Sequence, residues 1–271
     1  MSGLLSAEET GFYVENGYLV VRGLFARDEV DLILDAAVSD DRLRQAAYSR
    51  TDTEGNETRM SVWDELDDDI YSIAMRTRRV VGRVEELIGE PVCHYNSKLN
   101  AKDAKVGGRW EWHQDYGYAY GYGVLAPQMA TCFVSLDPST RENGCIEMLA
   151  GSHKLGRIDH AFVGKQYCAD MDRMKIAEER LAVATCELDA GDAVFFHCNT
   201  LHRSGANRSD RRRWALITVY NAVSNQPYKE GPHSGFHPVD MVEDDVLRTC
   251  VGRVSTASKR FQARAYNPAA A

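Results

Sequence analysis

Two histidines and an aspartate have the side-chain types and the spacing that hold a metal ion. His113 and Asp115 stand two residues apart, so on an extended segment both side chains leave the same face. His202 lies much later, at the end of an apolar run that a turn at Gly191-Asp192 begins. Two histidines and one carboxylate on one face of an octahedron leave three coordination positions open, as non-haem Fe(II) oxygenases require. The three residues therefore predict a catalytic iron site with room for a cosubstrate and O₂.

A serine and an arginine beyond His202 predict a carboxylate site beside the metal. Ser204 follows His202 by two residues, and Arg213 begins the next apolar strand. A planar guanidinium binds a carboxylate through two parallel hydrogen bonds, and a neighbouring hydroxyl can donate a third. Together they would hold the distal carboxylate of a dicarboxylate.

In order and spacing, these motifs resemble the phytanoyl-CoA dioxygenase family of Fe(II)/2-oxoglutarate oxygenases. The similarity extends from about Tyr18 to Asn221 and includes the segment Glu142–Lys154 between the two metal motifs. The resemblance implies a double-stranded β-helix, the jelly-roll core of cupin-like proteins. It also implies an enzyme that hydroxylates an unactivated C–H bond of a small-molecule metabolite or natural product, with release of succinate and CO₂.

The same resemblance implies a role for each residue of the site. Fe(II) binds the triad, 2-oxoglutarate chelates the metal, and its far carboxylate contacts an arginine and a serine. Two asparagines on the strand before the first metal motif contact the cosubstrate, or simply belong to a strand. These residues are His113, Asp115 and His202 for the metal, Arg213 and Ser204 for the far carboxylate, and Asn96 and Asn100 for the cosubstrate.

The resemblance also decides between alternatives at two of the ligands. Ser204 and Arg213 stand at the family's spacing from His202 and not from His197, so we expect His197 to pack nearby. Family members that halogenate have a small residue at the position of Asp115, so this carboxylate favours hydroxylation over halogenation.

Two other functions would use the same ligands. A non-catalytic sensor of the same fold would bind metal and 2-oxoglutarate without turnover. A Zn²⁺ hydrolase also uses histidine and carboxylate ligands, but it would gain nothing from Arg213 and Ser204 and would need a general base, which we do not identify. Hydroxylation is therefore the main expectation, and a sensor is the alternative.

Aromatic and basic side chains around the metal motif indicate where a substrate binds. Tyrosines alternate with Gly and Ala directly after Asp115, and they form either an aromatic wall that excludes water or an exposed loop. Basic residues near the mouth would suit an anionic substrate, although each could equally be an exposed charge. The candidates are Lys98, Tyr116, Tyr118, Tyr120, Arg157 and His160.

The elements that position these residues change character at Pro91. Before it, a capping box and apolar residues at three- and four-residue steps predict helices. These helices cover Ser6–Glu15, Arg27–Ala37 and, as a pair that Gly89 ends, about Val62–Leu87, with a short strand at Tyr18–Val21. After it come short β-rich runs at Val92–Ala101, Met129–Leu136, Cys145–Met148, Thr185–Leu188, Ala193–Phe196 and Trp214–Tyr220.

This order of elements predicts one mainly β sandwich or barrel with flanking helices, and the resemblance implies that residues 1–271 form a single oxygenase domain. Residues 1–90 would form a mainly helical buttress, 91–222 the β-helix core and 223–271 a C-terminal extension. A polar insertion at about 155–181 would cover the mouth of the barrel or form a surface excursion.

The composition of the chain limits the kinds of binding partner and the cellular compartment that we expect. The chain has 271 residues, 44% of them hydrophobic, and a formal net charge of −8, which disfavours polyanionic partners such as nucleic acid. No run approaches the ~18 apolar residues of a membrane span, and residues 1–10 lack the pattern of a signal peptide. Seven cysteines without paired spacing indicate reduced thiols. We therefore expect a cytoplasmic enzyme with a small-molecule substrate.

Overall fold

The computed structural model describes residues 3–229 and 237–262 of the chain. The helices are α1 (Ala7–Asn16), α2 (Arg27–Ser39), α3 (Asp41–Gln45), α4 (Ile70–Arg76), α5 (Arg78–Ile88), α6 (Asp115–Gly121), α7 (Met171–Arg180) and the 3-10 helices η1 (Ser152–Leu155) and η2 (Asp244–Thr249). The strands are β1 (Tyr18–Val21), β2 (Tyr48–Thr51), β3 (Glu57–Trp63), β4 (Val92–Lys102), β5 (Trp110–His113), β6 (Met129–Ser135), β7 (Ile146–Leu149), β8 (His160–Val163), β9 (Gln166–Ala169), β10 (Val183–Cys186), β11 (Ala193–His197), β12 (His202–Ser204) and β13 (Arg213–Ala222).

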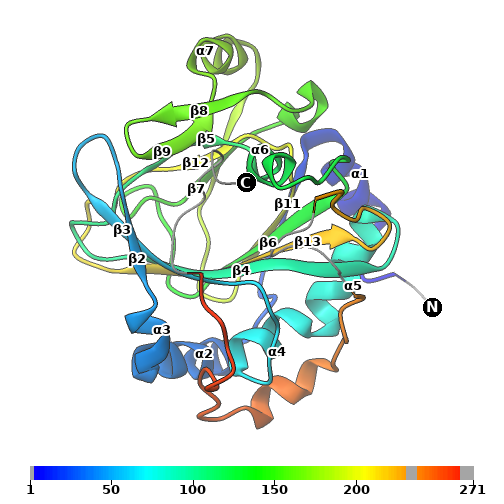
Figure 1. Cartoon of the computed structure of the whole chain (residues 1–271), viewed down its shortest axis with the longest axis vertical. Coiled ribbons are helices and arrows are strands. Elements are labelled where there is room, and N and C mark those ends of the chain that lie inside the picture. The colour runs from blue at the N-terminus through cyan, green and yellow to red at the C-terminus, as the bar shows by residue number, and fades with distance from the viewer. Residues whose placement is uncertain (1–2, 230–236, 263–271) are drawn as a thin grey trace.

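Two antiparallel sheets face each other and form the core of the molecule (Figure 1). The major sheet has the strand order β1-β11-β6-β13-β4-β3-β2, and the minor sheet has the order β10-β7-β12-β5. Side chains alternate along each strand, so in β11 Val194 and Phe196 point between the sheets while Phe195 points to the outer face. The expected double-stranded β-helix with flanking helices is confirmed.

Helices cover the outer face of the major sheet. In Figure 1, α2, α4 and α5 lie against the side of this sheet that faces away from the minor sheet. The apolar face of α2, which includes Val30 and Ile33, is fully buried there. The predicted helix start at Ser6 is confirmed as a capping box with Glu9, and Gly89 ends α5 in the left-handed conformation as predicted.

The first third of the chain also contributes strands, and one predicted boundary there is wrong. The apolar run from Val62 was predicted to be helical, but Val62 lies in β3 and pairs with Lys98 of β4. The prediction joined the apolar end of β3 to α4 across residues 64–69, which are acidic except for Leu66 and separate the two elements in the structure. The hairpin of β2 and β3, at the edge of the major sheet, was not predicted.

The turn before β11 fixes the strand that leads to the second metal motif. Gly191 has a φ of 95°, and a Cβ there would lie 2.2 Å from the carbonyl oxygen of Phe25, so only glycine fits. The carboxylate of Asp192 accepts hydrogen bonds from the backbone N–H of Gly23 (2.8 Å) and of Asp189 (2.9 Å). The Gly-Asp turn that the sequence indicates is therefore present, and these hydrogen bonds fix its conformation at the start of β11.

The insertion at about 155–181 forms the β8–β9 hairpin and α7, at the top of Figure 1. At the other end of the chain, Phe261 forms a β-bridge with Trp63.

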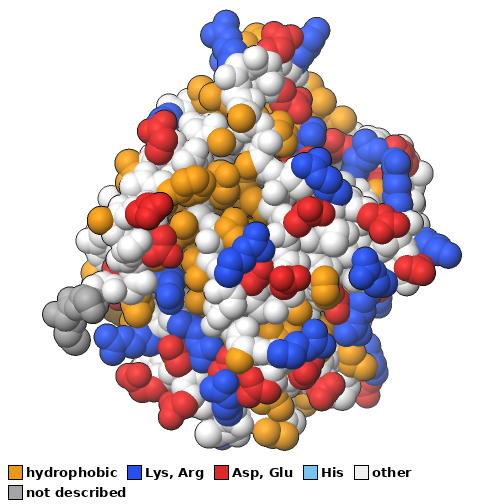
Figure 2. All heavy atoms as spheres, turned by 180° about the vertical axis from the view of Figure 1, so that it is seen from behind, with side chains coloured by type: hydrophobic (Ala, Val, Ile, Leu, Met, Phe, Trp, Pro, Cys, Tyr) orange, Lys and Arg blue, Asp and Glu red, His pale blue; other side chains and the backbone are white. Residues whose placement is uncertain are grey.

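All seven cysteines are buried and free. No helix in the two described ranges has the length and apolar character that crossing a membrane would take. Acidic and basic side chains are interspersed on the face that Figure 2 shows.

Candidate active site

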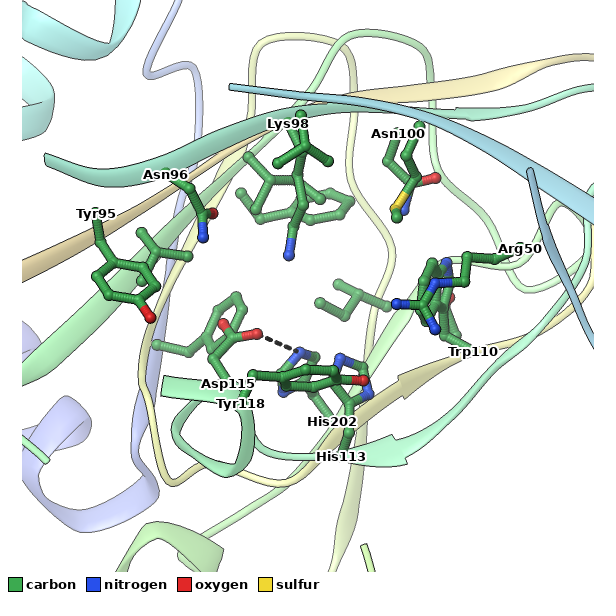
Figure 3. Close-up of a pocket in the computed structure, with 18 of the residues that line it drawn as sticks. Arg50, Tyr95, Asn96, Lys98, Asn100, Trp110, His113, Asp115, Tyr118 and His202 are labelled. Atoms are coloured by element: carbon green, nitrogen blue, oxygen red, sulfur yellow. Dashed lines mark ion pairs between the residues drawn. The ribbon is translucent and has the colours of Figure 1, made fainter. Parts of the chain in front are cut away.

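The structure brings His113, Asp115 and His202 together between the two sheets. His113 ends β5 and His202 begins β12, and the two residues are direct partners across these strands. One ligand atom from each of the three side chains lies within 4.8 Å of the others. Figure 3 shows the three groups converging on one end of a cavity, with His202 Nε2 3.9 Å from Asp115 Oδ1. This nitrogen, nitrogen and oxygen donor set fits one non-haem iron ion.

Gln114 explains why two neighbouring ligands point the same way. Its backbone is extended, so His113 and Asp115 leave one face and the Gln114 side chain leaves the other. On that opposite face Gln114 is fully buried, its Nε2 donates to the carbonyl of Gly156 (2.7 Å), and its Oε1 accepts from the N–H of Ile158 (2.7 Å). The middle residue of the motif therefore anchors the two metal ligands.

Backbone carbonyls orient both histidine rings. Nδ1 of His113 donates to the carbonyl of Glu111 (2.8 Å), and Nδ1 of His202 donates to the carbonyl of Thr200 (3.0 Å). Because a carbonyl only accepts, each ring presents the lone pair of Nε2 to the centre of the site. Burial lowers the pKa of His113 and of His202, which keeps both rings neutral and able to bind a metal.

Asp115 is held in its ionised form. Its Oδ2 accepts a hydrogen bond of 2.6 Å from the hydroxyl of Thr131. Burial alone would raise the pKa of this carboxyl group, but the positive charge of Lys98 and the hydrogen bond from Thr131 outweigh burial and hold the pKa below its usual value. An ionised carboxylate and two neutral imidazoles are the states that bind Fe(II).

His197 lies outside this group. Its Nδ1 accepts a hydrogen bond of 3.0 Å from the N–H of Asn199, and its ring centroid is 5.6 Å from that of His153. Of His197, which ends β11, and His202, which begins β12, the side chain of His202 lies with those of His113 and Asp115.

Arg213 forms a buried corner of the cavity and makes no ion pair within residues 3–229 and 237–262. Its side chain is 1% exposed, and Nη2 donates to the carbonyl of Gly144 (3.0 Å). Nε and Nη1 have no hydrogen-bond partner among the described residues. Burial lowers the pKa of Arg213 to about 10, so the guanidinium remains charged at neutral pH. Buried donors without partners are costly, and a carboxylate of 2-oxoglutarate fits this corner.

Lys102, which was not predicted from the sequence, orients the hydroxyl of Ser204 at the same corner of the cavity. Its buried Nζ donates to Ser204 Oγ (2.9 Å) and to the carbonyl of Gly205. Because an ammonium group only donates, the Ser204 hydroxyl accepts from Lys102 and keeps its own proton free to donate. Burial and the nearby Arg213 lower the pKa of Lys102. Its position at the end of β4 looked in the sequence like the start of a loop.

Strand β4 lines the cavity as the sequence indicates. Asn96, Lys98 and Asn100 alternate along it and all reach the cavity (Figure 3). The Oδ1 atom of Asn100 is buried and has no hydrogen-bond partner. These three residues therefore remain candidates for contacts with cosubstrate or substrate.

Of the three candidate tyrosines, only Tyr118 reaches the cavity. Its ring centroid is 5.9 Å from that of His113, and its hydroxyl donates to the carbonyl of Tyr167 (2.5 Å). Tyr116 is buried in a separate apolar cluster, and Tyr120 is 44% exposed. The predicted alternation fails because these residues lie in α6, where residues two apart point in different directions.

Arg157 and His160 do not line the cavity either. Arg157 pairs with Asp159 (2.6 Å), and its guanidinium lies 4.4 Å from the ring centroid of Tyr120. His160 Nε2 accepts from the N–H of Gln114 (3.0 Å), so it supports the metal motif from behind. Both side chains thus have local partners, and neither lines the cavity.

Several residues of the cavity were missed in the sequence. Tyr48 and Arg50 come from β2, and Trp110 and Gln262 complete that side. The alternation of Tyr48 and Arg50 along four residues is too short to stand out, and nothing in the local sequence brings Gln262 back to the site.

Comparisons with known proteins agree with this geometry. The family model described as phytanoyl-CoA dioxygenase (PhyH) matches residues 13–215. L-proline trans-4-hydroxylase from Streptomyces griseoviridis is 33% identical over 59% of this chain and 66% of its own length, just under two thirds. Ectoine dioxygenase from Bordetella bronchiseptica is 25% identical over 82% of this chain and 77% of its own length.

Solved structures share the fold. EctD from S. alaskensis with bound Fe superposes with a TM-score of 0.74 at 21% identity, covering 89% of both chains. The same protein with 2-oxoglutarate and 5-hydroxyectoine gives a TM-score of 0.71 at 22% identity, covering 94% of this chain and 88% of that one. The chain therefore belongs to the phytanoyl-CoA dioxygenase family of iron- and 2-oxoglutarate-dependent oxygenases.

Proposed function

We propose that this enzyme hydroxylates a C–H bond of a small molecule at an Fe(II) ion held by His113, Asp115 and His202. The proximity of the three ligand atoms carries the proposal. Within the described ranges, no fourth histidine, cysteine or carboxylate joins the group, so half of an octahedral coordination sphere is left to cosubstrate and O₂. When bound, iron and 2-oxoglutarate together activate O₂ for oxidation of the substrate, with release of succinate and CO₂.

The residues of the chain divide the remaining work. Arg213 and Ser204 bind the far carboxylate of 2-oxoglutarate, and Lys102 orients the serine hydroxyl. Tyr118 and Trp110 cover the metal end of the cavity (Figure 3) and exclude water from it. Asn96 and Asn100 offer amide groups to the bound molecules.

The substrate is a small molecule, and we infer that it is anionic. The relatives named above act on L-proline and ectoine. In this chain Lys98 points into the cavity from β4 (Figure 3), and an anion would balance its charge.

We further propose a cytoplasmic location and one working domain over residues 1–271. Seven free thiols support a reducing compartment. Strands β1, β2 and β3 of the first 90 residues join the same sheet as those of residues 91–222, which supports a single unit of buttress, core and C-terminal extension.

The test combines binding and turnover. Anaerobic addition of Fe(II) and 2-oxoglutarate should produce a weak visible charge-transfer band, and admission of O₂ with a substrate should produce succinate. Absence of the band would contradict the proposed metal and cosubstrate site. A band without succinate formation from any small molecule would instead indicate a sensor.

A further inference from the structure

Two buried arginines with unpartnered donors line the same cavity, and 2-oxoglutarate explains only one of them. Arg213 binds the cosubstrate in the function proposed above. Arg50 on β2 is 7% exposed, and its Nε has no hydrogen-bond partner in the part of the chain that the structure describes. Its Nη1 makes a long hydrogen bond of 3.3 Å to the carbonyl of Lys165. A buried guanidinium with so few acceptors is stabilised by an anion.

Among the described residues, no ion pair neutralises the two cations of this part of the cavity, Arg50 and Lys98. In the parts of the chain that the structure describes, neither Arg50 nor Lys98 forms an ion pair with an aspartate or glutamate, whereas Arg109 and Arg157 nearby both do. The negative charges of Asp115 and of the two carboxylates of 2-oxoglutarate would not exceed the positive charges of Fe(II), Arg213 and Lys102. Arg50 and Lys98 then remain uncompensated in the loaded enzyme, which favours an anionic third ligand.

The geometry places the two cations where they can act on one small molecule. In Figure 3, Lys98 reaches into the cavity from β4 and Arg50 reaches into it from the adjacent wall, beside Trp110. The Arg50 guanidinium lies 5.8 Å from the centroid of the Trp110 ring, which helps to fix its orientation. Tyr48, Tyr118 and Trp110 supply apolar surface for the uncharged part of the ligand.

We propose that Arg50 binds a carboxylate of the molecule that is oxidised, so that the substrates are small organic acids with an apolar body. The inference rests on the proposed function, because it takes the Arg213 corner as occupied by 2-oxoglutarate. Lys98 adds positive charge between this carboxylate and the metal end of the cavity. Arg157 and His160, the other basic candidates, take no part.

The test measures binding without turnover. Enzyme loaded with Zn(II) in place of iron and saturated with 2-oxoglutarate is titrated with a panel of small organic acids, L-amino acids and L-proline included, each paired with its carboxamide. We expect at least one acid to bind about 10-fold or more tightly than its amide. Arg50→Met should weaken binding of that acid by about 10- to 100-fold and leave the amide unchanged. Arg59→Met, an exposed arginine of the same hairpin, should bind the acid like the wild type.

Two results would overturn the inference. One is that no acid binds better than its amide, and the other is that Arg50→Met binds the acid as the wild type does. The charge-transfer band of Fe(II) and 2-oxoglutarate separates the two proposals, since Arg50→Met should keep the band and the wild-type dissociation constant for 2-oxoglutarate. If Arg50→Met weakened 2-oxoglutarate as much as Arg213→Met, Arg50 would belong to the cosubstrate site. Arg50→Gln replaces Arg50→Met if the latter does not fold.

Discussion

At the scale of single residues, the metal triad was predictable because two of its members are close in sequence and the third follows a recognisable turn. His113 and Asp115 are separated by one residue whose own side chain is tied down on the opposite face. His202 is reached through a strand that begins at Gly191-Asp192. The Lys102 contact was not predictable, because it depends on β4 and β12 meeting in space.

Removing the only carboxylate of the triad should be severe. Asp115→Ala should weaken Fe(II) binding by more than about 100-fold, since loss of an outer hydrogen bond alone costs 10- to 100-fold, and it should abolish succinate formation. Equilibrium metal binding with a coloured Fe(II) chelator measures the effect. Asp172→Ala, on the exposed side of α7, is the control, and full activity in Asp115→Ala would show that the ligand assignment is wrong.

Lys102 should matter only for cosubstrates that have a distal carboxylate. Lys102→Met removes the donor that orients Ser204, so the dissociation constant of 2-oxoglutarate should rise roughly tenfold. Binding of 2-oxobutyrate, a keto acid without that carboxylate, should stay the same. Titration of the Fe(II) enzyme under anaerobic conditions gives both constants. Exposed Lys105→Met should change neither, and equal losses for both keto acids would refute the role of Lys102.

At the scale of elements, the sequence predicted most strands and helices but not the edge hairpin or α6. The central strands are continuous apolar runs bounded by turn residues, which is the pattern of strands buried on both faces. In sequence, the segment after Asp115 alternates as a strand does, but it forms the short helix α6. Tyr116 and Tyr120 therefore point away from the cavity. Short segments take their conformation from their surroundings more than from their own pattern.

Gln114 should contribute both to the folding stability of the junction between β5 and α6 and to the affinity for metal. Gln114→Ala removes hydrogen bonds to Gly156, Asn199 and Ile158 and leaves buried backbone groups unpaired, which should cost about 2–4 kcal/mol of unfolding free energy. The Fe(II) dissociation constant should rise as well, because His113 and Asp115 lose their anchor. Urea unfolding and metal titration test the two effects. Exposed Gln128→Ala should change neither, and a destabilised variant with wild-type metal affinity would argue against the coupling.

At the scale of the whole molecule, burial of histidines should make folding stability depend on pH. Burial lowers the pKa of His197 to about 4, whereas in the unfolded chain it is near 6.5. Between these values the unfolded state binds more protons, so the free energy of unfolding should fall as the pH drops from about 6.5 toward 4. His197 alone should contribute about 1–2 kcal/mol of this loss at pH 5.

Substitution of His197 tests whether this residue causes the pH dependence of the free energy of unfolding. Urea unfolding of the metal-free protein at several pH values should show a shallower dependence in His197→Asn than in the wild type. His237→Asn, at an exposed histidine, should leave the slope unchanged. Parallel curves for wild type and His197→Asn would rule out His197 as a source of the pH dependence.

The hairpin of β2 and β3 lies at one end of the major sheet, where β2 pairs with β3 alone. The residues proposed to bind metal and cosubstrate come from β4, β5, β12, β13 and the start of α6, which are other parts of the chain. Natural variation or protein engineering can therefore replace the β2–β3 hairpin, with Arg50, and change which compounds the enzyme accepts. The residues that carry out the oxidation would stay the same.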